Sequence, residues 1–161
     1  MTVTDHTDPT PGISPDVEDL SLMFAKIITS KHNQHAIIMV VGAAGKGKSW
    51  AAIALARGVA VRVAEILGGK PEDYFNFEET FATISKEQVK RVMKDPKPHT
   101  ILVIDDAAAK AMNARNYKDQ DNIDFNSELT TFRPNHNLVI LTTQAGFLID
   151  KVPRSLCHFI I

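Results

Sequence analysis

Short apolar runs alternate with longer segments of helical spacing along this 161-residue chain. Three of these runs, at residues 36–41, 100–104 and 138–142, contain no charged side chain. Uncharged runs of this length are typical of strands that are covered on both faces of a parallel sheet. Because they alternate with helical segments, the pattern predicts an α/β fold, a three-layer sandwich with a mainly parallel central sheet.

Apolar residues recur at helical spacing in five segments, which are therefore predicted to be helices: 14–31, 48–67, 86–94, 107–118 and 122–132. Ser14-Pro15 is a typical helix start, with Ser as the N-cap and Pro in the first helical position. Ser85 and Gln88 form a capping box at the start of the third segment. The second segment has little polar face, so we expect it to be largely buried.

Two further strands are predicted from weaker signals. Residues 74–77 are expected to form a short second strand, and residues 156–161 a buried last strand. Cys157 lies in this last run, and we expect it to be a small core residue rather than a catalytic thiol. The last predicted strand runs to Ile161, which suggests that the chain is truncated at its C-terminus. Residues 1–13 are expected to be a disordered tail and residues 14–161 a single domain.

Charge and composition narrow the classes of function. The net charge is −1, from 18 Lys and Arg against 19 Asp and Glu, which argues against an autonomous charge-driven nucleic-acid binder. A locally basic surface in an oligomer remains compatible with this balance. A single cysteine excludes an intramolecular disulfide framework and fits a reducing cytoplasm.

Membrane, export and transition-metal signals are missing from the sequence. The N-terminus is polar and acidic, unlike a signal peptide, and no apolar run approaches the roughly 18 residues of a membrane helix. The six histidines are scattered without metal-ligand spacing, so we expect no transition-metal site. These features predict a cytoplasmic protein.

The most specific motif follows the first apolar run. Residues 42–49 fit G-x-x-x-x-G-K-[ST] at every fixed position, between a predicted strand and a predicted helix. The glycines let backbone N–H groups converge on one anion, and the helix start adds the positive end of its dipole. The pattern predicts a P-loop NTPase that binds ATP through these residues: Gly42, Ala43, Ala44, Gly45, Lys46, Gly47, Lys48, Ser49 and Trp50.

Two side chains of this loop have expected roles in the chemistry. Lys48 would reach the β- and γ-phosphates, and the Ser49 hydroxyl would occupy a position on Mg²⁺. A glycine-rich turn that happens to end in Lys-Ser is the alternative, but the flanking strand and helix argue against it.

Asp105 and Asp106 follow the apolar run 100–104 and would complete the site. Open parallel sheets bind ligands at the carboxyl ends of their strands, so we expect Asp105 beside the phosphate loop, holding Mg²⁺ through water or Ser49. Asp106 is a candidate for orienting the attacking water, with a reach one methylene shorter than that of Glu. Both residues also suit the N-cap of the following helix, and this alternative stays open.

Three polar residues near the later strands are further candidates. Gln144 ends the run that starts at Leu138, where its amide could contact both the γ-phosphate and the attacking water. Arg133 and Arg154 each precede a predicted strand and are candidate arginine fingers. A solvated surface arginine is the favoured interpretation of either one by itself.

These elements together resemble a known group. The phosphate loop, the strand ending in Asp105-Asp106 and Thr143-Gln144 at the end of the next strand resemble the FtsK/HerA superfamily of ring-forming DNA and protein-export motors. Residues 131–144 are similar to zonula-occludens-toxin-like phage ATPases and their archaeal relatives. The resemblance spans residues 36–161, and its phosphate loop is shared by P-loop proteins in general.

The resemblance implies a homo-oligomeric ring, typically a hexamer, that uses ATP hydrolysis to move DNA. It implies Gln144 as a polar sensor and Arg133 as a residue presented to the neighbouring subunit, beside Lys48 and Asp106 as the other catalytic residues. Members usually have Glu where this chain has Asp106, and this departure predicts weak turnover.

We therefore expect an Mg²⁺-dependent ATPase that is a subunit of a DNA-handling motor, with DNA bound directly or through a partner. The alternative is a nucleotide-dependent switch or adaptor that binds ATP with little turnover, which Asp106 favours. A small-molecule kinase would need an arginine-rich lid, and a GTPase would need an Asn-Lys-x-Asp element. We find neither pattern in the sequence.

Overall fold

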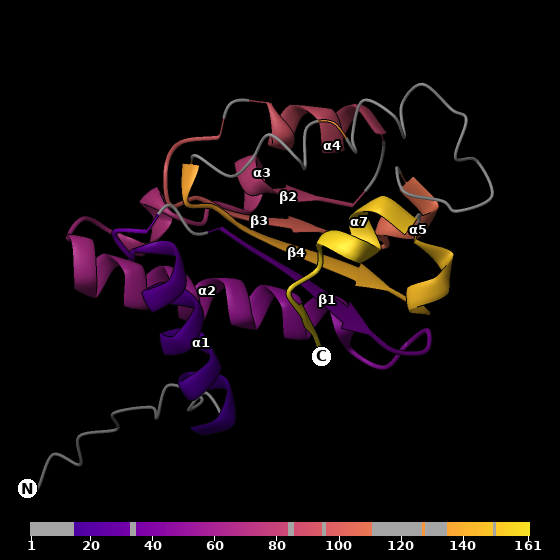
Figure 1. Ribbon diagram of the computed structural model, residues 1–161, viewed down its shortest axis with the longest axis horizontal. Helices are drawn as coiled ribbons and strands as arrows, with labels where there is room; N and C mark the ends of the chain where they lie inside the picture. The colour runs from indigo at the N-terminus through magenta and orange to yellow at the C-terminus, as the bar shows by residue number, and fades with distance from the viewer. Residues whose placement is uncertain are drawn as a thin grey trace, which may run out of the picture.

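Five parallel strands form one sheet in the order β2-β3-β4-β1-β5 (Figure 1). The computed structural model describes residues 15–32, 35–83, 86–94, 96–110, 127, 135–149 and 151–161. Within them, the strands are β1 (Ala36–Val41), β2 (Phe81–Ala82), β3 (Ile101–Ile104), β4 (Leu138–Thr143) and β5 (Phe159–Ile160). The prediction of an α/β fold with a parallel sheet is confirmed.

Strand β4 lies between the two strands that carry the predicted site. It pairs with β1 from Ala36↔Leu138 to Val41↔Thr143, and with β3 from Ile101↔Leu138 to Ile104↔Leu141. Because all three strands are parallel, their carboxyl ends meet at one edge of the sheet, where the segments after them can converge.

Helices cover both faces of this sheet (Figure 1). The described helices are α1 (Pro15–Ile28), α2 (Lys48–Leu67), α3 (Phe77–Thr80), α4 (Lys86–Met93), α5 (Ala107–Lys110) and α7 (Lys151–Leu156), with 3₁₀ turns η1 (Pro71–Asp73) and η4 (Gly146–Leu148). Side chains of β1 alternate between the layers: Ile38 packs with α1 and α2, and Ile37 with α4 and α5. The predicted three-layer sandwich is thus confirmed.

The short second strand was predicted in the wrong place. Residues 74–77 do not form a strand; Phe77 begins α3, and β2 follows at Phe81–Ala82. The physical reason is the Asn76 side chain, whose Oδ1 accepts a hydrogen bond from the Glu78 backbone N–H at 3.0 Å and so caps α3. The aromatic residues on either side of Asn76 suggested a strand, but the cap decides the local structure.

The last predicted strand is also wrong in extent and in burial. Residues Lys151–Leu156 form helix α7, with Pro153 in its first turn, where the missing N–H costs nothing. Only Phe159–Ile160 form a strand, and Ile160 is 68% exposed. Cys157 therefore lies between a helix and an exposed strand, half-buried, rather than within a buried strand.

The other helix predictions differ less. Helix α1 ends at Ile28, a few residues before the predicted end near Lys31. The predicted helix 107–118 is represented by α5, and its remainder, like most of 122–132, lies outside the described residues. The predicted tail 1–13 and Ser85 of the capping box lie outside them too. No described helix is long and apolar enough to cross a membrane.

Candidate nucleotide-binding site

The phosphate loop joins the carboxyl end of β1 to the start of α2, as the motif predicts. Gly45 and Gly47 have φ values of 72° and 80°, in the left-handed region that residues with a Cβ rarely adopt. Gly47 occupies the N-cap of α2, so the turn that aims the helix start into the loop depends on this glycine. The loop backbone itself is exposed from Ala43 to Gly47, and an anion can reach it.

Two hydrogen bonds hold the ends of the loop in place. The Gly42 N–H donates to the Thr143 carbonyl at 3.2 Å, which ties the loop start to β4. The Lys48 ammonium donates to the Ala43 carbonyl at 3.1 Å, so the lysine side chain lies across its own loop. A cation held in this position is placed to exchange a carbonyl for a phosphate oxygen. Trp50, the last residue of the predicted nucleotide-binding set, is 76% exposed beside the loop.

Ser49 and Asp105 meet at the sheet edge. The Ser49 hydroxyl donates to Asp105 Oδ1 at 2.7 Å, across 56 positions of sequence. Asp105 directly follows β3 and is half-buried, as is Ser49. The two predicted metal-site residues are therefore brought together, and both offer the hard oxygen atoms that Mg²⁺ prefers.

A buried threonine holds the two aspartates in place. The Thr142 hydroxyl donates to Asp105 Oδ1 at 2.7 Å and accepts from the Asp106 backbone N–H at 2.9 Å. Thr142 lies near the end of β4 and is 1% exposed. Since a hydroxyl has one donor and can still accept, both bonds can exist together. The sequence pattern alone gave Thr142 no role, although two threonines at the end of an apolar strand were a usable signal.

Thr83 is a second residue that the sequence analysis missed. It follows β2, and its hydroxyl lies 3.4 Å from Asp105 Oδ2, a long hydrogen bond. Its own N–H donates to Gln88 Oε1 of α4 at 3.0 Å. Because β2 was predicted at residues 74–77, no pattern placed Thr83 at the carboxyl end of a strand.

Asp106 has an unusual backbone. Its φ is 50°, left-handed, which Asp tolerates better than most residues with a Cβ. Helix α5 begins at the next residue, so Asp106 does precede a helix as the alternative interpretation required. An N-cap normally has an extended backbone. The Asp106 carboxylate makes no hydrogen bond to any residue that the structure describes, and is available to another group.

The remaining predicted residues are placed unevenly. Gln144 follows β4 and is exposed at the same sheet edge. Arg154 is exposed on α7, and Arg133 lies outside the described residues. In the described part of the chain, no three His, Cys, Asp or Glu side chains gather as they would around a metal ion.

The chain is similar to one known family. Residues 38–161 match the family model described as "ATPase family associated with various cellular activities (AAA)". Among curated proteins, none matches the sequence.

Solved structures of similar fold include a Thermotoga maritima protein and an E. coli one. The first is RuvB, a Holliday junction branch migration motor, with 13% identity over 92% of this chain and 44% of that chain, at a TM-score of 0.51. The second belongs to the E. coli MS115-1 HORMA:CdnC:Trip13 complex, with 14% identity over 93% of this chain and 62% of that one, at a TM-score of 0.57. This chain thus spans less than half the length of RuvB, and at these identities the likeness concerns the fold alone.

Proposed function

Since the chain belongs to the AAA family of ATPases, we propose that it hydrolyses ATP with Mg²⁺ as a subunit of an oligomeric DNA-handling motor. The observation that carries the ATPase part is the 2.7 Å contact between Ser49 and Asp105, at the end of a loop in which Gly45 and Gly47 already have the left-handed backbone. Two oxygen ligands from opposite halves of the sequence meet where the loop presents its N–H groups.

Each residue of the loop then has a defined task. The N–H groups between Gly42 and Ser49 bind the phosphates, and the start of α2 adds its dipole. Lys48 releases the Ala43 carbonyl and takes a phosphate oxygen. Ser49 and Asp105 hold Mg²⁺, which when bound neutralises charge on the phosphate oxygens.

The attacking water is oriented by side chains at the same sheet edge. Asp106 is the first candidate, because its carboxylate has no described partner and its N–H is fixed by Thr142. Gln144, exposed after β4, is the polar sensor in this proposal. Arg133 is proposed as the finger presented to the neighbouring subunit, with Arg154 as the second choice.

The motor part of the proposal is supported by two likenesses. The sequence resembles the FtsK/HerA motors in the residues around Asp105 and Gln144, and the fold resembles that of RuvB. Membership of FtsK/HerA stays a prediction beside the AAA family match. With a net charge of −1, DNA contact would need a local basic surface of the assembled oligomer or a partner.

The test is steady-state ATP hydrolysis at several protein concentrations, with and without double-stranded DNA. A rate per subunit that rises with concentration and with DNA is expected of a motor with shared sites. Lys48→Ala should abolish nucleotide binding or turnover while the circular dichroism spectrum is unchanged. Lys31→Ala, an exposed lysine after α1, is the matched control and should hydrolyse ATP like the wild type. Full activity of Lys48→Ala would refute the proposal.

A mixing experiment tests the finger. Arg133→Ala should impair hydrolysis more than binding, and adding Lys48→Ala protein should restore part of the rate, because intact composite sites form between the two variants. Assembled mixtures without any recovery would exclude the trans role of Arg133.

A nucleotide switch is the second candidate, and Asp106 is the observation that favours it. A carboxylate one methylene shorter than Glu reaches less far toward the water, which would leave ATP bound and unhydrolysed. Asp106→Glu distinguishes the two. A rise in turnover from a negligible wild-type rate would identify the native protein as a switch, whereas a wild-type rate that already equals that of the variant would support the motor.

A further inference from the structure

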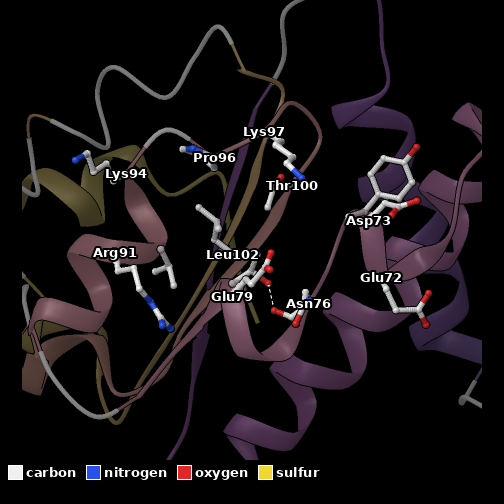
Figure 2. Close-up of a pocket in the computed structure, with 13 residues that line it drawn as sticks. Glu72, Asp73, Asn76, Glu79, Arg91, Lys94, Pro96, Lys97, Thr100 and Leu102 are labelled. Carbon is white, nitrogen blue, oxygen red and sulfur yellow. Dashed lines mark hydrogen bonds between the residues drawn. The ribbon is translucent and has the colours of Figure 1, made fainter.

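A cavity of about 420 Å³ opens at the end of the sheet opposite to the phosphate loop. Its floor includes Thr100 and Leu102, at the start of β3, whereas Asp105 follows the end of the same strand. One side comes from η1 and α3, and the other from α4 and the segment that follows it (Figure 2). A cavity of this size is in the range of ligand sites.

The two sides of this cavity carry opposite charges. Figure 2 shows Arg91 and Lys94 on the α4 side and Glu72 and Asp73 on the η1 side, with Lys97 and Glu79 between them. Among the described residues that line it, three cations and three anions cancel in sum. We call this cavity the charge-split pocket and define it by these six residues.

Two of the six charged side chains make hydrogen bonds within the described part of the fold, and the other four do not. No ion pair between described residues joins its two sides. The Arg91 guanidinium donates to the Glu78 carbonyl at 2.9 Å, and the Asp73 carboxylate accepts from the Lys70 N–H at 2.8 Å. The side chains of Glu72, Glu79, Lys94 and Lys97 have no described partner, so a ligand can meet them without breaking a native contact.

The charge arrangement selects one class of ligand. A nucleic acid or free nucleotide would be attracted by Lys94 and Lys97 and repelled by Glu79 and Glu72, and a polycation the reverse. A free amino acid has one charge of each sign and would leave most of the pocket charges unmatched. A peptide that alternates acidic and basic residues matches both sides, because an extended backbone sends successive side chains in opposite directions.

We propose that the charge-split pocket binds an extended segment of a partner protein in which acidic and basic residues alternate. The acidic side chains meet Arg91, Lys94 and Lys97, and the basic ones meet Glu72, Asp73 and Glu79.

Occupation of the pocket is transmitted to the nucleotide site. Both sides of the pocket lead to Thr83: α3 runs through β2 into it, and α4 contacts its N–H through Gln88. The Thr83 hydroxyl in turn lies 3.4 Å from Asp105. A ligand that draws the two sides together therefore changes the position of a residue beside the carboxylate. This part of the inference rests on the proposed ATPase function, and the binding part does not.

Binding is measured without nucleotide, by amide NMR titration at low ionic strength. The probe is the capped hexapeptide Ac-Glu-Lys-Glu-Lys-Glu-Lys-NH₂, and the control is Ac-Glu-Glu-Glu-Lys-Lys-Lys-NH₂, which has the same composition. We expect saturable shifts of the amide signals of Glu79, Arg91 and Lys97. The control peptide should bind with at least roughly fivefold lower affinity, which is the effect of about one exposed ion pair.

Charge variants locate the peptide. Lys94→Glu should lower the affinity for the alternating peptide by roughly fivefold, because one favourable contact is lost and a repulsion replaces it. Lys31→Glu makes the same charge change outside the pocket and should leave binding unaltered. Equal binding of the two peptides, or equal loss in the two variants, would overturn the proposal. So would a single-stranded oligonucleotide that binds the same amides more tightly than the peptide.

Transmission is measured on the ATP turnover of the wild type with and without saturating peptide. Transmission is supported if the peptide changes the turnover rate of the wild type but does not change that of Thr83→Val. An unchanged wild-type rate, with the peptide bound, would refute the transmission and leave the binding site standing.

Discussion

Thr142→Val tests the link between the two aspartates of the site. Valine has nearly the same shape as threonine, so the substitution leaves the packing of β4 in place and removes only the hydroxyl. The lost bonds are the one to Asp105 Oδ1 at 2.7 Å and the one from the Asp106 N–H at 2.9 Å. At 1% exposure, Thr142 leaves no room for water to replace them.

The magnitude follows from the kinds of bond. A hydrogen bond to a charged group contributes about 1.5–3 kcal/mol and a neutral one about 0.5–1.5 kcal/mol. The added methyl of valine offsets about 0.8 kcal/mol, and half-burial of Asp105 favours the lower end of each range. We expect the free energy of unfolding to fall by about 1 kcal/mol, which lowers Tm by roughly 2–4 °C for a domain of this size.

Urea unfolding at pH 7 without nucleotide measures this loss. Thr142→Ser keeps the hydroxyl but deletes a buried methyl, so it should lose about 0.8 kcal/mol from that change alone. Thr143→Val is the matched neighbour, since Thr143 is also fully buried but its hydroxyl contacts only the Ala145 carbonyl, at 3.2 Å, so its loss should be smaller. If Thr142→Val unfolds at the wild-type urea concentration, or if Thr143→Val loses as much stability as Thr142→Val, the Thr142 hydroxyl does not hold the two aspartates and our reasoning fails.

Burial raises the pKa of the Cys157 thiol from 9.0 to about 11. Iodoacetamide at pH 8 should therefore label the folded chain roughly 100-fold more slowly than the urea-unfolded chain. Equal labelling rates would contradict this prediction. The unfolded state loses this proton first, so stability should fall as pH rises from 9.0 toward 11, a slope that Cys157→Ala should reduce in pH-dependent urea unfolding. A Cβ at Gly58 would overlap the Ser21 hydroxyl where α1 meets α2, so Gly58→Ala should destabilise by about 1–3 kcal/mol. Ser21→Ala should recover part of this loss, and a double-mutant cycle in urea without coupling would contradict the overlap. Trp50, the single tryptophan, lies exposed beside Ser49, so binding of ATP with Mg²⁺ should change its fluorescence. If the fluorescence stays the same at a nucleotide concentration that calorimetry shows to be saturating, the nucleotide binds elsewhere.

The central strands were predictable because burial on both faces leaves a run without charges. Residues 36–41 and 138–142 have this pattern, and the structure pairs them along their whole length. The meeting of Ser49 and Asp105 was predictable too, since both follow parallel strands whose carboxyl ends share one edge.

The features that escaped prediction depend on contacts between distant segments. Thr142 is one of two threonines that end an apolar strand, and its two hydrogen bonds exist only because β3 lies alongside β4. The position of β2 was decided by a single cap at Asn76, a local contact that outweighed the aromatic pattern. The apolar residues between Leu156 and Ile161 suggested a core strand, but among the described strands only β1 pairs with β5, which lies at the edge of the sheet.

The strand order also has a consequence for how the chain folds. Strand β1 is made about 100 residues before both of its neighbours: Ala36 pairs with Leu138, and Ile38 with Phe159. Until those residues emerge from the ribosome, the apolar strand 36–41 has no sheet to join, and such long-range pairing is slow and exposes the chain to aggregation. The phosphate loop therefore reaches its final form only after residues 138–160 have been made, and nucleotide present during synthesis would not bind a chain that lacks them.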